Sequence, residues 1–481
     1  MRLLHAASEI FPLVKTGGLA DVLGALPAAQ AAAGDDVMVV VPGYPRVLAA
    51  GDGLAEIAPI AERFGASGRL LKGRLEGLAV PAYVVDIPEF FDREGNPYIG
   101  ADGADRPDNW ARFAAFARAA ADLAQGADPA WRPDLLHAHD WQAALAPAFL
   151  AHERPAVPSV LTVHNLAYQG LFPAERYAAL GLPDAFWGPE GAEYWGQVSY
   201  LKAGLMTATK LSTVSYTYAV EIQGPEQGCG LDGVLRARAA DLTGIVNGVD
   251  YAIWSPERDP HLPCGYRPGA MAGKALVKTV LRRELGLESV SDVPLFGVVS
   301  RLTWHKGLDL LAAAAEAVLS RGAQIALLGS GEKGLEAAFE ALAVRHPAQV
   351  AVRLGYDEAL AHRIIGGADV ILVPSRSEPC GLTQLYGLKY GTLPLVRATG
   401  GLADTVVNAE AAAVDEGRAT GFVFHDATAP ALAGTLGWVC DMWRDRAIWQ
   451  RIQAAAMAQD FSWARAAGDY RALYSAALAP G

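Results

Sequence analysis

Short apolar runs alternate with Ala-rich segments of helical character, and this alternation occurs twice along the chain. The apolar runs predict strands at 2–8, 37–42, 82–87, 135–139, 159–164 and 211–215, and again at 295–301, 324–329, 350–355, 369–375 and 393–398. Helices are predicted between them, for example at 110–124, 308–321 and 335–345. Such alternation is typical of parallel sheets covered on both faces. We therefore predict an α/β fold with two doubly wound, Rossmann-like domains.

The length of 481 residues also favours two domains, because a single core rarely serves so long a chain. We place the boundary within 244–256, where a short strand ends in Asn-Gly and a Pro-rich stretch follows. This predicts one domain over 1–245, a second over 246–458, and a C-terminal helical segment over 459–481.

The charge balance excludes some classes of partner. The net charge is −12, whereas proteins that bind nucleic acids or anionic membranes present basic surfaces. The four cysteines form no CxxC pair, Glu9 interrupts the first apolar stretch, and no apolar run reaches the roughly 18 residues of a membrane helix. We expect a cytoplasmic protein that binds neither nucleic acid nor membrane, and nothing in the sequence specifies an oligomeric state.

Unusual polar residues follow the predicted strands in both halves. The segments concerned are SEIFPLVKTGG, HDWQ, HNLAYQG, RLTWHKG, SRSEPCGLTQ and TGGLADT. In open parallel sheets, ligands bind beyond the carboxyl ends of the strands. We therefore expect each domain to present its chemistry on one edge, with a cleft between the facing edges.

The sequence TGGLADV at 16–22 returns as TGGLADT at 399–405. Each copy follows an apolar strand and begins an Ala/Leu-rich helix. Paired glycines let a ligand approach the backbone, and the start of a helix offers N–H groups to phosphate. Lys15 precedes the first copy and adds a positive charge. The alternative is that the glycines only form a tight turn.

Two cations and one carboxylate stand out in the second half. Arg301 and Lys306 lie five residues apart at a predicted strand end and are candidates for a clamp on a diphosphate. Glu378 lies between a strand and a helix, where it could hold sugar hydroxyls or stabilise a developing positive charge. The alternatives are a solvated basic pair and a helix-capping carboxylate.

Histidines at strand ends are further candidates. His164 and Asn165 close one strand, and His137, His139 and Asp140 close another. Two histidines on one strand face suggest a metal site, but no third ligand is evident, and the chain contains no DxD motif. We predict no metal.

Two other functions stay open on the residues alone. GSGEKG at 329–334 fits the dinucleotide-binding pattern, with Asp357 at a suitable distance for a ribose, and indicates an NAD(P)-dependent oxidoreductase. That function leaves Lys15, the Arg301/Lys306 pair and both TGGLAD copies without a role. A non-catalytic, two-lobed sugar-binding protein is the other alternative, although cationic residues are unusual for a neutral sugar.

Several motifs occur together in one order: KTGGLADV, HAHDWQ, TVHNLAYQG, NGVD, SRLTWHKG, PSRSEPCGLTQLYG and TGGLADT. With them the whole chain resembles the bacterial glycogen synthases, grouped with plant starch synthases in glycosyltransferase family five. The resemblance implies a GT-B fold whose C-terminal helix crosses back to the first domain. It also implies transfer of glucose from ADP-glucose to the non-reducing end of an α-1,4-glucan such as glycogen, with retention at the anomeric carbon and no metal or other cofactor.

The resemblance assigns roles to individual residues. The implied catalytic residues are His164, Arg301, Lys306 and Glu378. The implied donor- and substrate-binding residues are Lys15, Gly17, Gly18, Asp21, Tyr98, Asp140, Asn165, Asn247, Tyr356, Cys380, Gly381, Leu382 and Thr383. GSGEKG then becomes a nucleotide-side turn. Ser377 and His305 depart from the residues usual at their positions in this family.

The residues also suit this chemistry. Cleavage of a sugar–diphosphate bond places charge on the leaving oxygen, and fixed cations stabilise it. No Asp/Glu pair is positioned as nucleophile and acid in the manner of a glycosidase. We hypothesise that the leaving phosphate takes the proton of the acceptor.

Overall fold

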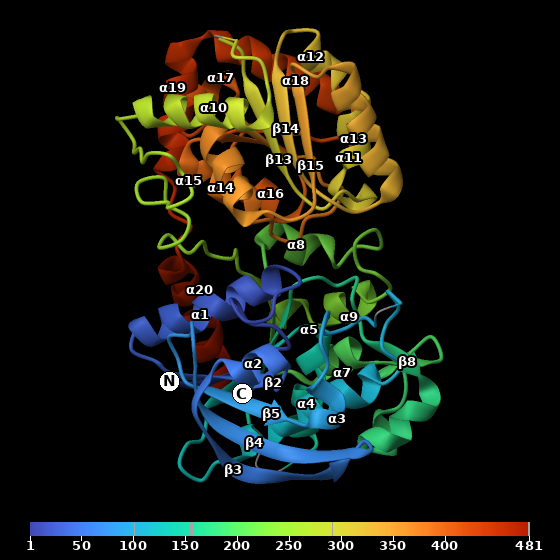
Figure 1. Ribbon diagram of the computed structural model, residues 1–481. Helices are drawn as coiled ribbons and strands as arrows, with labels where there is room; N and C mark the ends of the chain where they lie inside the picture. The colour runs from blue at the N-terminus through green and yellow to red at the C-terminus, as the bar shows by residue number, and fades with distance from the viewer. Residues whose placement is uncertain (101, 154–156, 291, 480–481) are drawn as a thin grey trace. The chain divides into compact units, whose positions relative to one another are not determined.

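The computed structural model describes residues 1–100, 102–153, 157–290 and 292–479. These residues form two compact units. Unit 1 contains Met1–Gly248 together with the C-terminal segment that starts at Trp463, and unit 2 contains Val249–Ser462. Figure 1 shows a sheet with flanking helices in each unit.

Unit 1 is built on a nine-stranded sheet in the order β12-β11-β7-β6-β1-β2-β5-β4-β3. Its strands are β1 (Arg2–Ala6), β2 (Asp36–Pro42), β3 (Gly51–Arg63), β4 (Ala66–Leu75), β5 (Ala82–Asp86), β6 (Leu135–His139), β7 (Ser159–Val163), β11 (Lys210–Thr213) and β12 (Leu242–Gly244). All neighbours are parallel except β5–β4 and β4–β3, which are antiparallel. A separate small sheet contains β8 (Leu171–Pro173), β10 (Gln197–Ser199) and β9 (Glu193–Tyr194).

Helices cover this sheet because its central strands are apolar on both faces. They are α1 (Gly18–Ala32), α2 (Pro45–Ala49), α3 (Pro88–Phe91), α4 (Asn109–Gln125), α5 (Asp140–Ala143), α6 (Leu145–Ala151), α7 (Tyr200–Thr207), α8 (Tyr216–Glu221), α9 (Asp232–Ala237) and α20 (Trp463–Leu478). The C-terminal α20 packs beside α1 and buries Tyr470 and Tyr474 in the core of unit 1 (Figure 1). The last helix of the chain thus completes the first unit.

Unit 2 contains a six-stranded, wholly parallel sheet in the order β15-β14-β13-β16-β17-β18. Its strands are β13 (Leu295–Val299), β14 (Gln324–Gly329), β15 (Val350–Leu354), β16 (Val370–Val373), β17 (Leu393–Arg397) and β18 (Phe422–Phe424). Its helices are α10 (Ala272–Leu285), α11 (Leu308–Ala314), α12 (Glu316–Leu319), α13 (Lys333–Arg345), α14 (Glu358–Gly367), α15 (Thr383–Tyr390), α16 (Gly400–Thr405), α17 (Ala411–Asp415), α18 (Ala429–Arg444) and α19 (Arg446–Met457).

Local chemistry sets several helix starts. Asp357 accepts a hydrogen bond from the N–H of Leu360 and caps α14, and Asp445 does the same for α19. Asp357 therefore has a structural role at the position where a ribose-binding acid was considered.

Each sheet has a topological switch point, where the strand order reverses. In unit 1 this lies at β1 and β6, and in unit 2 at β13 and β16. Ligands bind at such points in doubly wound folds. The segments that follow these four strands contain Glu9 and Lys15, Asp140, Arg301 and Lys306, and Glu378.

The predicted class of two doubly wound α/β sheets is confirmed, and all eleven predicted strands are present. The β3–β4 hairpin was not predicted, because no residue of β3 is buried and its pattern is mixed. The helix expected over 308–321 is divided, with α11 ending at Ala314 and α12 beginning at Glu316.

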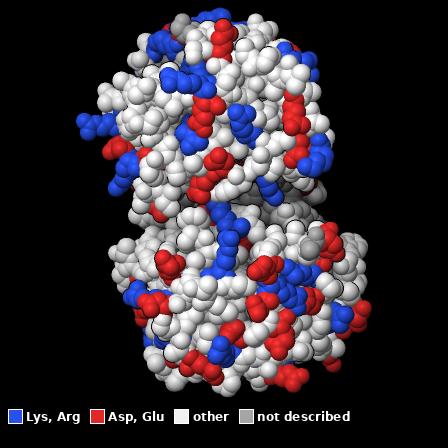
Figure 2. Space-filling view, in the orientation of Figure 1, with Lys and Arg blue, Asp and Glu red and all other residues white. Residues whose placement is uncertain are grey.

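Charged side chains of both signs are intermixed on the face of each unit shown in Figure 2. Within the described residues, no helix combines the length and the apolar character needed to cross a bilayer.

Candidate active site

The switch point of unit 2 brings together a cation and a carboxylate. Lys306 Nζ lies 2.5 Å from Glu378 Oε2, and Ser375 Oγ lies 2.9 Å from the same oxygen. Glu378 is buried and Lys306 is half-buried. Both line a cavity of about 50 Å³ together with Gly381, Leu382 and Thr383. Five of the predicted site residues therefore share one small pocket.

A close backbone contact places Lys306 at this pocket. Gly307 follows Lys306 with φ +67°, and a Cβ atom at Gly307 would lie 2.0 Å from the carbonyl oxygen of Pro374. Only glycine allows this approach and this φ without strain. Arg376 fixes the same turn, because its guanidinium binds both carboxylate oxygens of Asp309 at 2.6 and 2.8 Å.

The glycines of the second TGGLAD copy pack closely against the backbone of the loop that contains Glu378. A Cβ atom at Gly400 would lie 2.0 Å from the carbonyl oxygen of Glu378, and one at Gly401 would lie 2.2 Å from that of Cys380. These glycines are therefore needed for packing of protein against protein, and the expectation that both copies expose their glycines to a ligand is wrong for this copy. Gln384, fully buried, binds the carbonyl oxygens of Cys380 and Gly381 from the other side.

The start of α15 faces the same pocket. No side chain caps this helix, whose N-cap is Leu382 and whose first residue is Thr383. Uncapped N–H groups and the helix dipole favour an anion there. Arg301 is exposed, and its guanidinium has no hydrogen-bond partner among the described residues. Tyr356 is 79% exposed at the end of β15.

The GSGEKG turn has a structural role in unit 2. Cβ atoms at Gly329 and Gly331 would lie 1.8 and 2.3 Å from the carbonyl oxygens of Ser300 and Leu302. Glu336 accepts the N–H of Gly331 at 2.9 Å, so a carboxylate of the protein already occupies the turn where a pyrophosphate would bind. The glycines thus hold the segment around Arg301 in place.

In unit 1, the first TGGLAD copy is organised by Glu9, which the sequence analysis did not assign. The buried Glu9 carboxylate accepts the N–H groups of Thr16 at 2.5 Å and Gly17 at 3.3 Å. Tyr98 Oη also donates to Glu9 at 2.5 Å. The N–H groups of Thr16 and Gly17 are therefore already paired within the protein. The sequence signal for this role of Glu9 was an acidic residue in an apolar stretch just after the first predicted strand.

Lys15, Gly17 and Gly18 surround the start of α1. Lys15 Nζ lies 2.7 Å from Asp21 Oδ1, so two predicted site residues form an ion pair. No atom lies within 4 Å of a Cβ placed on Gly17 or Gly18. Unlike the second copy, this one leaves open space above its glycines.

Asp140, His164 and Asn165 form a third group, at the ends of β6 and β7. Asp140 has φ +55° and accepts the N–H of His164 at 2.7 Å. Burial raises the pKa of Asp140 to about 7, while N–H donors from His164 and Asn165 oppose that rise. Burial lowers the pKa of His164 to about 3, so its ring is neutral. Asn247 is also buried in unit 1, with Oδ1 unpaired among the described residues.

A third histidine approaches the pair that the sequence analysis considered for a metal. His5 of β1 joins His137 and His139, and one nitrogen of each lies within 4.8 Å of the others. A third possible ligand is therefore present, contrary to the expectation from the sequence. It was missed because β1 and β6 are distant in sequence although they are adjacent in the sheet.

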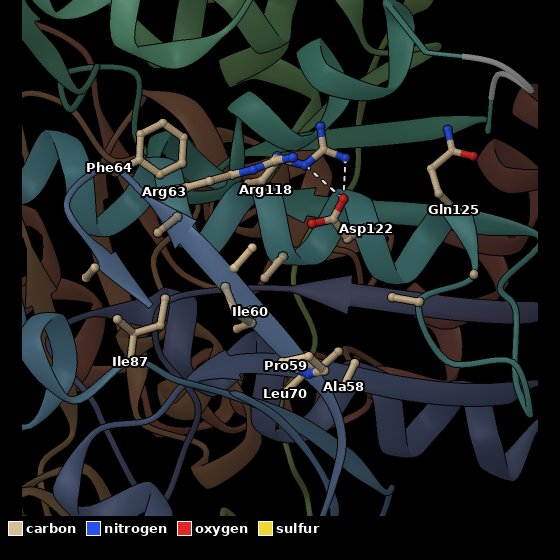
Figure 3. A pocket seen from close by; sticks show the side chains of 16 residues that line it. Ala58, Pro59, Ile60, Arg63, Phe64, Leu70, Ile87, Arg118, Asp122 and Gln125 are labelled. Atoms are coloured by element: carbon tan, nitrogen blue, oxygen red, sulfur yellow. Dashed lines mark hydrogen bonds and ion pairs between the residues drawn. The ribbon is translucent and has the colours of Figure 1, made fainter. Parts of the chain in front are cut away.

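A larger cavity lies elsewhere in unit 1. It measures about 430 Å³ and is lined mostly by apolar residues of β3, β4 and α4. Figure 3 shows three charged residues that line it, Arg63, Arg118 and Asp122, of which Arg118 and Asp122 bind each other at 2.6 Å. It contains none of the predicted site residues.

Known families match both units. The description "Starch synthase catalytic domain" matches residues 2–237, and "Glycosyl transferases group 1" matches residues 285–453. A glycogen synthase from Leptothrix cholodnii is 53% identical over 98% of this chain and 99% of its own length. This chain belongs to the glycogen synthase family. A second member, from Paramagnetospirillum magneticum, is 49% identical over 98% of this chain and 97% of its own length.

A solved relative has the same fold over nearly the whole chain. The catalytic domain of starch synthase IV from Arabidopsis thaliana, bound to ADP and acarbose, is 31% identical, with a TM-score of 0.88 and 99% coverage of both chains. A sucrose-phosphate synthase from Thermosynechococcus elongatus, at 17% identity and a TM-score of 0.60, shares the fold only. The chain is thus a glycosyltransferase of the GT-B fold, and the predicted family is confirmed. The oxidoreductase and the non-catalytic sugar-binding protein are excluded.

Proposed function

We propose that this enzyme transfers glucose from ADP-glucose to the non-reducing end of an α-1,4-glucan, with retention at the anomeric carbon and release of ADP. The observation that carries the proposal is the Lys306–Glu378 pair beside the uncapped start of α15, which combines a cation, a carboxylate and free N–H groups in one pocket. ADP and acarbose bind the starch synthase IV relative, which supports a nucleotide-linked donor and a saccharide acceptor.

The donor's diphosphate would be held by unit 2. The Arg301 guanidinium has no partner among the residues that the structure describes, and Lys306 carries its charge on a side chain that the Gly307 contact fixes. As the bond between the sugar and the diphosphate breaks, negative charge grows on the leaving oxygen. Preorganised cations and the dipole of α15 stabilise that charge without having to reorient.

Glu378 would act at the glucosyl unit. Its carboxylate is held by Ser375 and Lys306, so it can accept sugar hydroxyls or stabilise the oxocarbenium-like centre without rotating. The N–H groups that follow Cys380 would bind glucose hydroxyls. Since no second carboxylate lines this pocket among the described residues, we assign the acceptor's proton to the leaving phosphate.

Residues of unit 1 complete the assignment. Lys15, Gly17 and Gly18 would contact the donor, with Asp21 holding the Lys15 ammonium in position. Asp140, His164 and Asn165 would bind sugar hydroxyls at the reacting face. Tyr98 is tied to Glu9, so its role is to hold the loop that carries Lys15.

The test offers ADP-glucose, UDP-glucose and NAD(P)H separately, each with glycogen, and measures release of the nucleoside diphosphate and incorporation of glucose. We expect ADP release that depends on glycogen and new α-1,4 linkages by NMR. Turnover with UDP-glucose alone would overturn the donor assignment.

A pair of lysine variants tests the clamp. Lys306→Ala removes the half-buried cation and should lower kcat by about 10²–10³-fold, as loss of one preorganised electrostatic group does. Lys333→Ala is the matched control, because Lys333 is 91% exposed and belongs to the GSGEKG turn. It should keep full turnover, and equal losses in both variants would contradict the proposal.

We also propose that the reaction needs no metal, because Arg301, Lys306 and the start of α15 supply the charge that a cation would otherwise provide. Turnover should survive dialysis against EDTA. Since both proposed substrates are metabolites of the cell interior, the proposal places the enzyme in the cytoplasm.

A further inference from the structure

A chain of three histidines runs through the core of unit 1 and ends at the candidate active site. His5 Nδ1 lies 3.1 Å from His139 Nε2, and His139 Nδ1 lies 3.0 Å from His164 Nε2. The three residues come from three neighbouring strands or strand ends, at β1, β6 and β7. His5 and His139 are fully buried, whereas His164 is half-buried.

The inner end of this chain is fixed by Gln30 of α1. His5 Nε2 lies 2.7 Å from Gln30 Oε1, and Gln30 Nε2 donates to the hydroxyl of Tyr474 at 2.9 Å. Because the amide nitrogen is used toward α20, the atom that faces His5 is an oxygen that can only accept. With the amide in this orientation, His5 carries its proton on Nε2.

The direction of every bond in the chain follows. Burial lowers the pKa of His5 to about 4, that of His164 to about 3, and that of His139 well below the usual range, so each ring is neutral and has one N–H. With its proton on Nε2, His5 accepts at Nδ1 from His139 Nε2. His139 then accepts at Nδ1 from His164 Nε2.

We propose that Gln30 is a positioning residue which, through His5 and His139, holds His164 as the Nε2–H tautomer and presents its Nδ1 as a hydrogen-bond acceptor to a sugar hydroxyl. The part that concerns the sugar rests on the proposed function. Among the described residues, His164 Nδ1 has no hydrogen-bond partner, so the lone pair is available. In the opposite tautomer this position would present an N–H donor instead.

This arrangement defines what His164 contributes. A neutral ring that accepts at Nδ1 orients the hydrogen of a hydroxyl group, and it has no proton to give at that atom. His164 is thus assigned to binding and orientation of a sugar hydroxyl, and the acceptor's proton has to leave by another group.

The neighbouring His137 completes a second branch of the same network. Tyr474 Oη accepts a hydrogen bond from Gln30 and donates its own hydrogen to His137 Nδ1, which lies 2.8 Å from Oη. On the other side of the ring, His137 Nε2 lies 2.6 Å from Thr162 Oγ1. Every ring nitrogen of His5, His137 and His139 therefore has a hydrogen-bond partner. This favours the network over a metal bound by these three histidines, which is the competing outcome of the test.

The decisive measurement is the tautomer of each ring in the full-length protein. Long-range ¹H–¹⁵N correlation spectra of protein labelled at its ten histidines distinguish a protonated Nε2 from a protonated Nδ1, and single His→Asn variants assign the signals. We expect Nε2–H for His164, His139 and His5. A protonated Nδ1 on His164, or stoichiometric bound metal in the purified protein, would overturn the proposal. This result is read without substrate, so it is independent of the proposed function.

Two substitutions at Gln30 test whether this residue of α1 sets the tautomer of His164. Gln30→Leu removes the acceptor, and the chain can then reverse to give Nδ1–H on His164. Gln30→Met keeps a weak acceptor with no donor and should retain the native tautomer. For Gln30→Leu we expect kcat/KM with glycogen to fall about tenfold, the equivalent of one hydrogen bond, with partial rescue in Gln30→Met. Unchanged tautomers in Gln30→Leu would refute the positioning role of Gln30. If that variant fails to fold, the spectra of the wild type and of Gln30→Met still test the tautomer of His164.

Discussion

Gly307 connects the backbone of unit 2 to the position of its candidate catalytic lysine, and Gly307→Ala tests that connection. The added Cβ would lie 2.0 Å from the carbonyl oxygen of Pro374, whereas real Cβ contacts stay beyond 3.0 Å, so the two segments must separate by about 1 Å. Lys306 immediately precedes Gly307, and Ser375, which binds Glu378, immediately follows Pro374. The separation therefore moves the two halves of the ion pair apart.

The size of the effect has two parts. An alanine at φ +67° costs about 1–2 kcal/mol of stability, because the left-handed conformation crowds its Cβ. A displacement of about 1 Å at a reacting group can cost about 10²-fold in rate. We expect kcat/KM to fall about 100-fold, which corresponds to about 2.7 kcal/mol of transition-state stabilisation.

The assay measures glycogen-dependent ADP release over a range of ADP-glucose concentrations, together with the urea midpoint of unfolding. Gly334→Ala is the matched control, because Gly334 lies in α13 of the same unit and a Cβ there meets no atom within 4 Å. That control should retain activity and gain about 0.5–1 kcal/mol of stability, as alanine does relative to glycine in a helix. Wild-type kcat/KM in Gly307→Ala would refute the idea that this contact positions Lys306.

Three further predictions concern the same structures. Glu378→Gln keeps the size of the side chain and removes its charge, so kcat should fall by about 10²-fold while the urea midpoint changes little; an unaltered kcat would contradict a role at the glucosyl unit. Gly401→Ala would bring a Cβ to 2.2 Å from the carbonyl oxygen of Cys380, and we expect a weaker affinity for ADP in calorimetry, with normal ADP binding as the contrary result. Asp140→Asn removes a carboxyl group whose pKa rises from 3.8 to about 7 on folding. Between pH 4 and 7 the folded wild type holds a proton that the unfolded chain has released, so its stability relative to the variant should decrease as the pH rises through this window and level off above it. Urea midpoints of both proteins at pH 5 and pH 8 test this, and a difference that does not change with pH would contradict the shift.

Local patterns were sufficient to predict eleven strands of the two sheets and the strand ends that carry polar residues. The run at 324–329 is buried along its whole length, and nearly continuous apolar runs are typical of parallel strands covered on both faces. The β3–β4 hairpin escaped prediction because β3, at the edge of the sheet, buries none of its residues, and β4 beside it has a mixed burial pattern. The glycines were recognised as unusual in both TGGLAD copies, but their different uses depend on which backbone lies opposite.

The fold class, the family and the kinds of side chain at the strand ends follow from the amino-acid sequence, because they depend on local periodicity and on motifs. The contacts between residues distant in the chain came only from the folded structure: Gly307 against Pro374, Glu9 with Tyr98, and Gln30 with His5 and Tyr474. Hydrogen-bond direction and close contact depend on which groups a buried atom faces, and sheet order and helix packing set that arrangement.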